Sequence, residues 1–186
     1  VQTCALPIFK RKLGESTVTV DFDGRTNETG FYHKHIDFGV AYPLQQSWIV
    51  ELKYRAQYRT KEDTWSLEHR PQFQLIKNIN RPSVKWQLRT RIEYRIREGK
   101  EDEIRNRSRI QIKAPKPISS LKITPFISNE FFFAPETWKH YINWVSFGFD
   151  LPKSKIGKPT IFYKYVITLI DGEWVPTYTF VFKLTI

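Results

Sequence analysis

Several common features are missing from this 186-residue sequence. It has no methionine, and its one cysteine is Cys4. No stretch of about 18 consecutive apolar residues is present, which excludes a transmembrane helix. The chain also has no glycine-rich phosphate loop, no low-complexity linker and no segment with convincing helical periodicity. Because the chain has neither helical segments nor a linker, and because all-β barrels can reach this length as one domain, we interpret it as a single all-β domain.

The first eight residues, VQTCALPI, look like the translation of a common sequencing-library adapter joined to a truncated reading frame. Such a segment is left out of fold reasoning. We therefore expect the natural sequence to begin near Phe9, with its own N-terminus and signal peptide lost. The alternative is a genuine short N-terminal arm. Without residues 1–8 the chain has no cysteine, which suits an oxidising compartment such as the periplasm.

A two-residue alternation recurs from residue 18 to the end of the chain. In residues 47–59, one face carries Trp48, Val50 and Leu52, while the other carries lysine and arginine, including Arg55. Successive side chains of a β-strand point to opposite faces, so this period predicts strands with one apolar and one charged face. The same pattern returns in residues 83–97, 104–113 and 178–186.

Nine segments rich in turn-forming residues divide the chain into about ten strands of roughly ten or more residues, near the length that crosses a bilayer at a tilt. With 30 lysines and arginines against 19 acidic residues, the polar faces hold more arginine than a solvated face needs. The sequence therefore predicts an antiparallel, up-and-down transmembrane β-barrel over residues 9–186, apolar outside and arginine-rich in the lumen. The expected turns are 24–30, 43–46, 60–63, 78–83, 98–102, 115–118, 134–137, 152–158 and 171–175.

Short motifs follow one another along the chain: YHKHIDFGVAY at 32–42, TWSLEHRP at 64–71, RTRIEYR at 89–95, RNRSR at 105–109 and PFISNEFFF at 125–133. Their order and spacing resemble a bacterial family catalogued as domain of unknown function 2490. The resemblance implies an outer-membrane β-barrel with at least one more strand upstream, and it implies no activity. Single-chain bacterial barrels have even strand numbers, so ten strands fit this rule and one added strand does not.

The charged faces supply the candidate functional residues. We expect Glu68 and Arg70 to lie beside Arg91 and Glu93. Two interpretations stay open: interlocking ion pairs that hold a narrow barrel shut, or an electropositive path that selects anions. The predicted lumen network consists of Arg55, Glu68, Arg70, Arg89, Arg91, Glu93, Arg95, Arg105, Arg107, Arg109 and Glu130.

A hairpin around Gly99 would join two of these arginine-rich strands. Its expected register places Glu93 near Arg107 and Arg95 near Arg105. Neighbouring arginines favour the charged form of a carboxyl group, so we expect these carboxylates to be ionised.

The apolar faces predict the lipid-facing wall, and a soluble periplasmic barrel of the lipocalin type, binding an anionic or lipidic ligand, would turn the same residues inward. We expect the tryptophans to lie mostly near strand ends, at headgroup level. Rings and cations on opposite faces argue against nucleic acid as a partner, because stacking on single strands needs both on one face. The predicted lipid-facing residues are Trp48, Val50, Leu52, Trp86, Leu88, Ile92, Tyr94, Phe180 and Phe182; the remaining tryptophans are Trp65, Trp138, Trp144 and Trp174.

No catalytic or metal site is expected. His33 and His35 share a strand face, but no third ligand accompanies them at metal spacing. His140 and Ser146 are separated by about 20 Å along one strand, so together with Asn143 they do not form a nucleophilic unit. We therefore expect a non-enzymatic protein without a cofactor.

The expected location is the bacterial outer membrane. The expected partners are outer-membrane lipid, small anions and the barrel-assembly machinery, which would act on the C-terminal strand. That strand alternates aromatic residues in the way of an assembly signal, although it ends in Ile186 where such signals usually end in Phe.

Overall fold

The computed structural model describes residues 2–27, 30–45, 47–61, 64–118, 120–135 and 139–186, and the side chains of 2–7, 27, 61, 139 and 140 are not described. The described residues form strands and contain no helix long and apolar enough to cross a membrane. The strands are β1 (Gln2–Leu13), β2 (Ser16–Asn27), β3 (Gly30–Gln45), β4 (Trp48–Lys61), β5 (Thr64–Asn80), β6 (Lys85–Arg97), β7 (Glu103–Lys113), β8 (Thr124–Ala134), β9 (Lys139–Asp150), β10 (Lys158–Ile170) and β11 (Glu173–Thr185).

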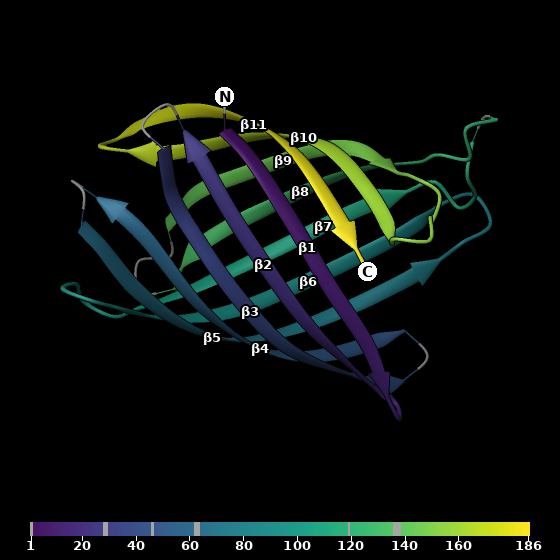
Figure 1. Ribbon diagram of the computed structural model, residues 1–186, viewed down its shortest axis with the longest axis horizontal. Coiled ribbons are helices and arrows are strands. Elements are labelled where there is room, and N and C mark those ends of the chain that lie inside the picture. The colour runs from purple at the N-terminus through teal and green to yellow at the C-terminus, as the bar shows by residue number, and fades with distance from the viewer. Residues whose placement is uncertain (1, 28–29, 46, 62–63, 119, 136–138) are drawn as a thin grey trace.

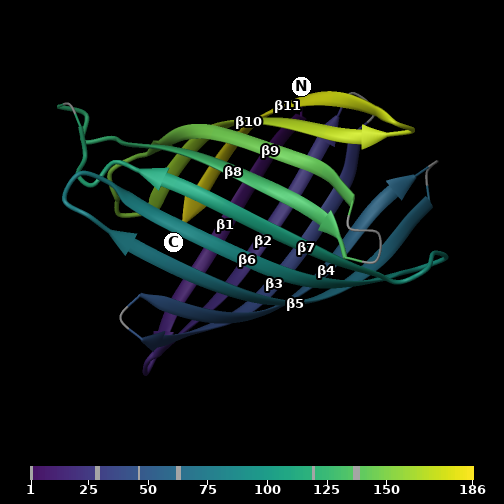
Figure 2. The same cartoon turned by 180° about the vertical axis from the view of Figure 1, so that it is seen from behind.

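The eleven strands close into one barrel, which confirms the predicted all-β barrel (Figures 1 and 2). Consecutive strands pair antiparallel all the way round, as expected for an up-and-down barrel. The count exceeds the expected ten because the sequence interpretation missed the turn at Gly14 and Glu15. Gly14 has a φ of 61°, a left-handed conformation that glycine adopts without steric cost.

The barrel closes through a parallel pair, β1 against β11. Their register runs from Gln2 opposite Thr179 to Ile8 opposite Thr185. Because the chain reverses at each hairpin, an odd number of strands brings the first and last strands side by side in the same direction. The backbone of residues 2–8, which resemble an adapter, makes this pairing (Figure 1).

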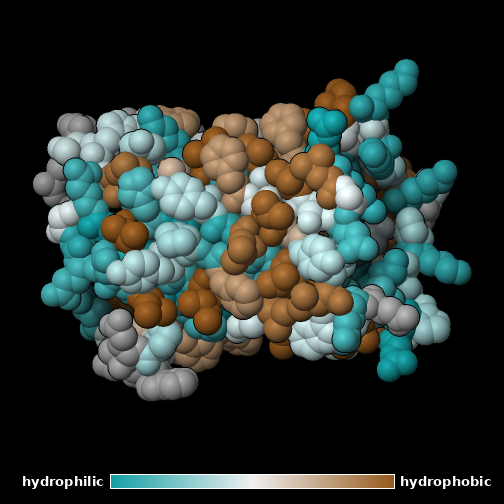
Figure 3. All heavy atoms as spheres, turned by 90° about the horizontal axis from the view of Figure 1, so that it is seen from below, coloured by the Kyte–Doolittle hydropathy of each residue, from teal (hydrophilic) through white to brown (hydrophobic). Residues whose placement is uncertain are grey.

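The barrel is polar inside and apolar outside, the reverse of an ordinary soluble core. Among the described residues, three hydrophobic side chains are buried, against eighteen polar or charged ones. On the outer wall, Leu52 is 62% exposed, Ile92 51% and Phe180 54%. Figure 3 shows hydrophobic side chains gathered across the middle of this wall, with hydrophilic ones projecting at the right-hand end.

The structure places the residues predicted to face lipid on this outer wall. Leu52, Leu88, Ile92, Tyr94, Phe180 and Phe182 are exposed, and Trp48, Val50 and Trp86 are half-buried. The lipocalin-like alternative needed these side chains to fill an apolar interior, and that packing is not found.

Two predicted registers are wrong. The β6–β7 hairpin is centred on Gly99 as expected, but its register places Glu93 opposite Arg105 and Arg95 opposite Glu103. Glu93 still contacts Arg107, at 3.1 Å, as predicted. The tight turn between β5 and β6 is closed by mutual backbone hydrogen bonds of Arg81 and Val84. That turn places Glu68 opposite Arg97, four or more residues from the expected partners, although Arg70 lies 3.6 Å from Glu93 as predicted. A shift by an even number of residues keeps every side chain on its own face, so the predicted lumen set is unaffected.

Candidate functional site

Five neighbouring strands, β4 to β8, carry the predicted charge network on their inward positions. Strand alternation directs every second side chain into the lumen, and side chains directly opposite on adjacent strands are close enough to interact. All eleven predicted residues are buried or half-buried there: Arg55, Glu68, Arg70, Arg89, Arg91, Glu93, Arg95, Arg105, Arg107, Arg109 and Glu130.

Glu93 on β6 is the centre of this network. Its side chain is fully buried and lies within ion-pair distance of four arginines. The closest guanidinium nitrogens of Arg91, Arg107 and Arg70 lie 3.3, 3.1 and 3.6 Å from its carboxylate oxygens, and Arg105 donates through Nε at 2.9 Å. A buried carboxylate is costly unless it is paired and hydrogen-bonded, and the four guanidiniums supply those partners.

Glu68 on β5 is a second carboxylate with two arginine partners. Arg70 and Arg95 donate to it at 2.6 and 2.7 Å, and the Gln57 amide nitrogen lies 3.3 Å away. Arg70 thus joins Glu68 to Glu93. We call the six linked side chains, Gln57, Glu68, Arg70, Glu93, Arg95 and Arg105, the packed cluster.

A cavity of about 540 Å³, here called the lumen cavity, occupies another part of the interior and is lined by residues from all eleven strands. A smaller cavity of about 90 Å³ is lined in part by Gln57, Glu68 and Arg95, and the two cavities share no lining residue. Arg70, Glu93 and Arg105 line neither. The packed cluster therefore fills the interior between them.

The wall of the lumen cavity has an excess of positive charge. Eleven lysines and arginines and six carboxylates line it. Arg89 lies directly opposite Arg109, and both Arg89 and Arg107 bind Glu130. Arg109 donates to the amide oxygen of Gln87, and within the described part of the chain no carboxylate lies within ion-pair distance of it. Five positive charges of the wall are thus not balanced by acidic side chains in the same wall.

Aromatic rings also line the interior, at β8 to β10. Phe132 is 1% exposed, and its ring centre lies 4.6 Å from that of Trp144. The guanidinium carbon of Arg107 lies 4.5 Å from the Phe132 ring and 4.8 Å from the Trp144 ring. The Lys164 ammonium lies 4.4 Å from Trp144. These distances are typical of cation–π contacts.

This arrangement corrects two expectations. Trp144 lies inside the barrel rather than at a headgroup interface, and rings share a face with cations in this part of the wall. The sequence indicates this inward position of Trp144, because Trp144 is an even number of residues from Ser146 and Asp150 on β9 and so shares their face of the strand. Trp48, Trp65, Trp86 and Trp174 lie at or near the first residue of their strands, and Trp138 lies outside the described residues.

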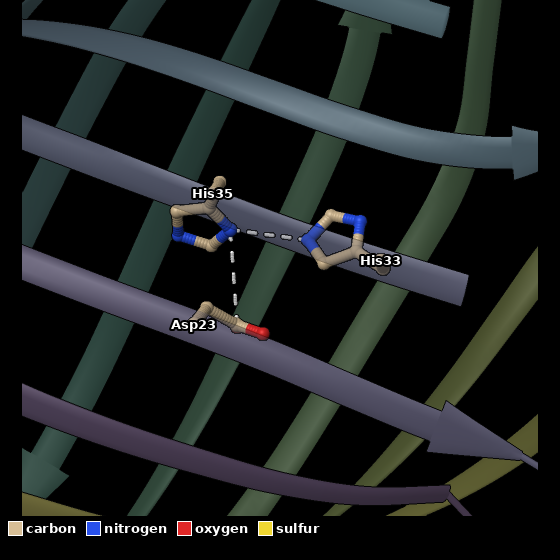
Figure 4. Close-up of side chains that lie close together, drawn as sticks. All are labelled: Asp23, His33 and His35. Carbon is tan, nitrogen blue, oxygen red and sulfur yellow. Dashed lines mark hydrogen bonds and ion pairs between the residues drawn. The ribbon is translucent and has the colours of Figure 1, made fainter. Parts of the chain in front are cut away.

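Three further polar side chains meet where β2 and β3 pair. Nε2 of His33 lies 3.1 Å from Nδ1 of His35, and a carboxylate oxygen of Asp23 lies 4.0 Å from the same His35 nitrogen (Figure 4). The expectation that no third ligand accompanies the histidines is wrong, because Asp23 comes from the neighbouring strand, directly opposite His35. The side chain of His140 lies outside the described residues, so its separation from Ser146 stays a prediction.

Comparison with known families gives a match over most of the chain. The sequence model of a family described as "Protein of unknown function (DUF2490)" matches residues 9–168. No curated protein and no solved structure matches the chain.

Proposed function

The chain belongs to the DUF2490 family, whose description names no activity, and we propose from its architecture that it is a non-enzymatic barrel of the bacterial outer membrane whose lumen favours anions. The observation that carries this proposal is the pairing of an apolar outer wall with a lumen cavity whose lining has eleven basic side chains and six carboxylates.

The outer wall supports the membrane location. Every strand has 11 to 17 residues, enough to cross the hydrocarbon layer at a tilt. Exposed side chains such as Phe38, Leu52, Ile92 and Phe147 lie on this wall from β3 round to β9. A soluble monomer rarely exposes so continuous an apolar surface, whereas lipid covers it in a membrane barrel.

The charge of the lumen cavity supports the preference for anions. Rings of arginine and lysine select anions in pores, because the positive potential raises the local concentration of negative ions. The packed cluster narrows the interior, so the conductance we expect is small. The same cluster favours a second candidate function, a structural barrel that passes no solute.

The proposed partners follow from this assignment. Outer-membrane lipid would contact the apolar wall, and small anions would enter the lumen cavity. The assembly machinery would act on β11, whose outward Phe180 and Phe182 alternate with inward residues. Nucleic acid, a cofactor and a catalysed reaction are not part of the proposal.

The test begins with the chain expressed in a Gram-negative host behind a periplasmic export signal. An outer-membrane fraction whose gel mobility shifts on boiling is the expected result, and a soluble periplasmic product without a shift would contradict the membrane location. The purified barrel is then placed in a planar bilayer under a potassium chloride gradient. A reversal potential with the sign of chloride selectivity supports the anion path. A membrane barrel with no conductance supports the structural role instead.

A further inference from the structure

We propose that Asp23, His33 and His35 form a binding site for one divalent transition-metal ion, with Zn²⁺ as the ion that the donor set fits best. Two imidazole nitrogens and one carboxylate oxygen are a ligand set that such ions accept, leaving a coordination position for water. The three groups offer ligand atoms that all lie within 4.8 Å of one another, and all three residues are buried.

The two histidines are already spaced for a metal. In a tetrahedral zinc site with bonds of about 2.1 Å, two ligand atoms are about 3.4 Å apart. Nε2 of His33 and Nδ1 of His35 are 3.1 Å apart. Without a metal, one nitrogen donates a proton to the other. A metal ion placed between them would take the position of that proton and bind both lone pairs.

Asp23 needs only a small movement to complete the site. Its Oδ2 is 4.0 Å from Nδ1 of His35, and the three ligand atoms all lie within 4.8 Å of one another, so a shift of roughly 1 Å brings it to ligand spacing. The carboxylate is held from the other side by Arg25, through two contacts of 3.2 Å each. Those contacts are long for charge-assisted hydrogen bonds, and the Arg25 side chain is 30% exposed. The free-energy cost of breaking them, when the Asp23 side chain changes its rotamer, is therefore small.

The surroundings of His35 resemble the outer shell of a metal site. Metal-binding histidines usually direct their second ring nitrogen to a carboxylate, which fixes the tautomer. Nε2 of His35 lies 3.9 Å from Asp37, and Arg55 holds that carboxylate in place through bonds of 2.6 and 2.7 Å. The tautomer with its proton on Nε2, facing Asp37, is the one in which Nδ1 of His35 is available to a metal.

Two of the three ligand residues, Asp23 and His35, border the lumen cavity. Arg25 lines the same cavity, which also supplies the fourth ligand as a water molecule. The local charge weakens the affinity, because Arg25 and Arg55 lie close to the ligands. We therefore expect selectivity for ions that bind imidazole strongly over hard ions such as Mg²⁺, which prefer oxygen ligands.

The test measures Zn²⁺ binding by titration calorimetry on the full-length, tag-free barrel folded in detergent. We expect one Zn²⁺ per chain, and Co²⁺ at the same site should give the intense visible absorption of tetrahedral coordination. His35→Gln and Asp23→Asn should each weaken binding by more than roughly 100-fold, beyond the 10–100-fold loss typical for an outer-shell partner. The matched control is His69→Gln, because His69 contacts Tyr54 on the outer wall and should leave binding unchanged.

Arg25→Gln separates metal binding from a general loss of structure. It removes both a competitor for Asp23 and a nearby positive charge, so it should tighten Zn²⁺ binding by roughly tenfold. A damaged barrel would not bind more tightly. The proposal is overturned if the wild-type chain takes up no Zn²⁺, if His69→Gln weakens binding as much as His35→Gln, or if Asp23→Asn binds like the wild type.

Discussion

The packed cluster and the lumen cavity are built on the same alternating strands, yet they treat charge differently. In the packed cluster, Glu68 and Glu93 are each bound by at least two arginines, and Glu93 lines neither of the two cavities. Around the lumen cavity, eleven basic side chains face six carboxylates, and Arg109 has only an amide as its polar partner among the described residues.

The two regions differ in whether the charge is structural or is available to a ligand. A buried ion must have ionic partners because it has lost water, and removing one partner leaves the others uncompensated. A charge beside a cavity retains water, so it needs no fixed partner and can attract a mobile anion. We therefore expect carboxylate variants to cost most in the packed cluster, and arginine variants to change ion preference most in the lumen cavity.

Glu93→Gln should have the largest effect. The change removes the charge that holds four guanidiniums together in a buried place, which typically costs about 3–5 kcal/mol. The measurement is the urea midpoint for loss of the heat-modifiable band in detergent. Asp150→Asn is the control, because Asp150 lines the lumen cavity and one of its partners, Lys158, has a side chain that is 47% exposed. Equal losses in the two variants would remove the distinction between the regions.

Ile92→Arg tests the outer wall. Ile92 lies at the middle of β6 and is 51% exposed, so the new charge would face the centre of a bilayer, at a cost of about 2–4 kcal/mol. Folding into lipid vesicles at a series of urea concentrations measures the change. Leu121→Arg should be neutral, because Leu121 is 70% exposed and lies between β7 and β8. If both variants fold equally well, the wall does not face lipid.

Trp144→Leu should cost less, about 1–2 kcal/mol, because it removes cation–π contacts with Arg107 and Lys164 but leaves an apolar side chain. Urea unfolding in detergent measures this loss. Trp48→Leu is the matched control: Trp48 is the first residue of β4 and contacts Lys77, whereas Trp144 contacts the buried Arg107. A greater loss for Trp48 than for Trp144 would contradict the view that the buried contacts matter more.

The sequence was sufficient to predict which side chains face the lumen. Alternation depends on strand geometry alone, so the wall assignments of Leu52 and Arg107 needed no knowledge of the partner strands. The register in which two strands pair is harder to predict from the sequence, because it depends on the exact position of the turn. The two-residue error at Gly99 and the missed turn at Gly14 both arise from turn geometry, which composition defines only coarsely.

The candidate metal site shows the same limit. His33 and His35 are visible as a pair two residues apart, but Asp23 joins them only through the β2–β3 register. The predicted position of Trp144 was wrong for another reason. Tryptophan as a residue type favoured the membrane–water interface, whereas its even spacing from Ser146 placed it on the lumen face of β9. In this protein, the position of a residue within the alternation is a better guide than its chemical type.

Arg109→Gln should have the smallest effect on stability and a clear effect on ion preference. Arg109 lies directly opposite Arg89, and like charges in such pairs are destabilising, so removing one should change the free energy of unfolding by no more than about 1 kcal/mol. The lost charge belongs to the lumen cavity, so the reversal potential under a salt gradient should move toward zero.

Arg95→Gln is the control, since Arg95 binds Glu68 and Glu103 and does not line that cavity. It should destabilise the barrel and leave the ion preference of the folded fraction unchanged. The opposite pattern would place the selective charge in the packed cluster, and the lumen cavity would then be only a space that the arginines leave unfilled.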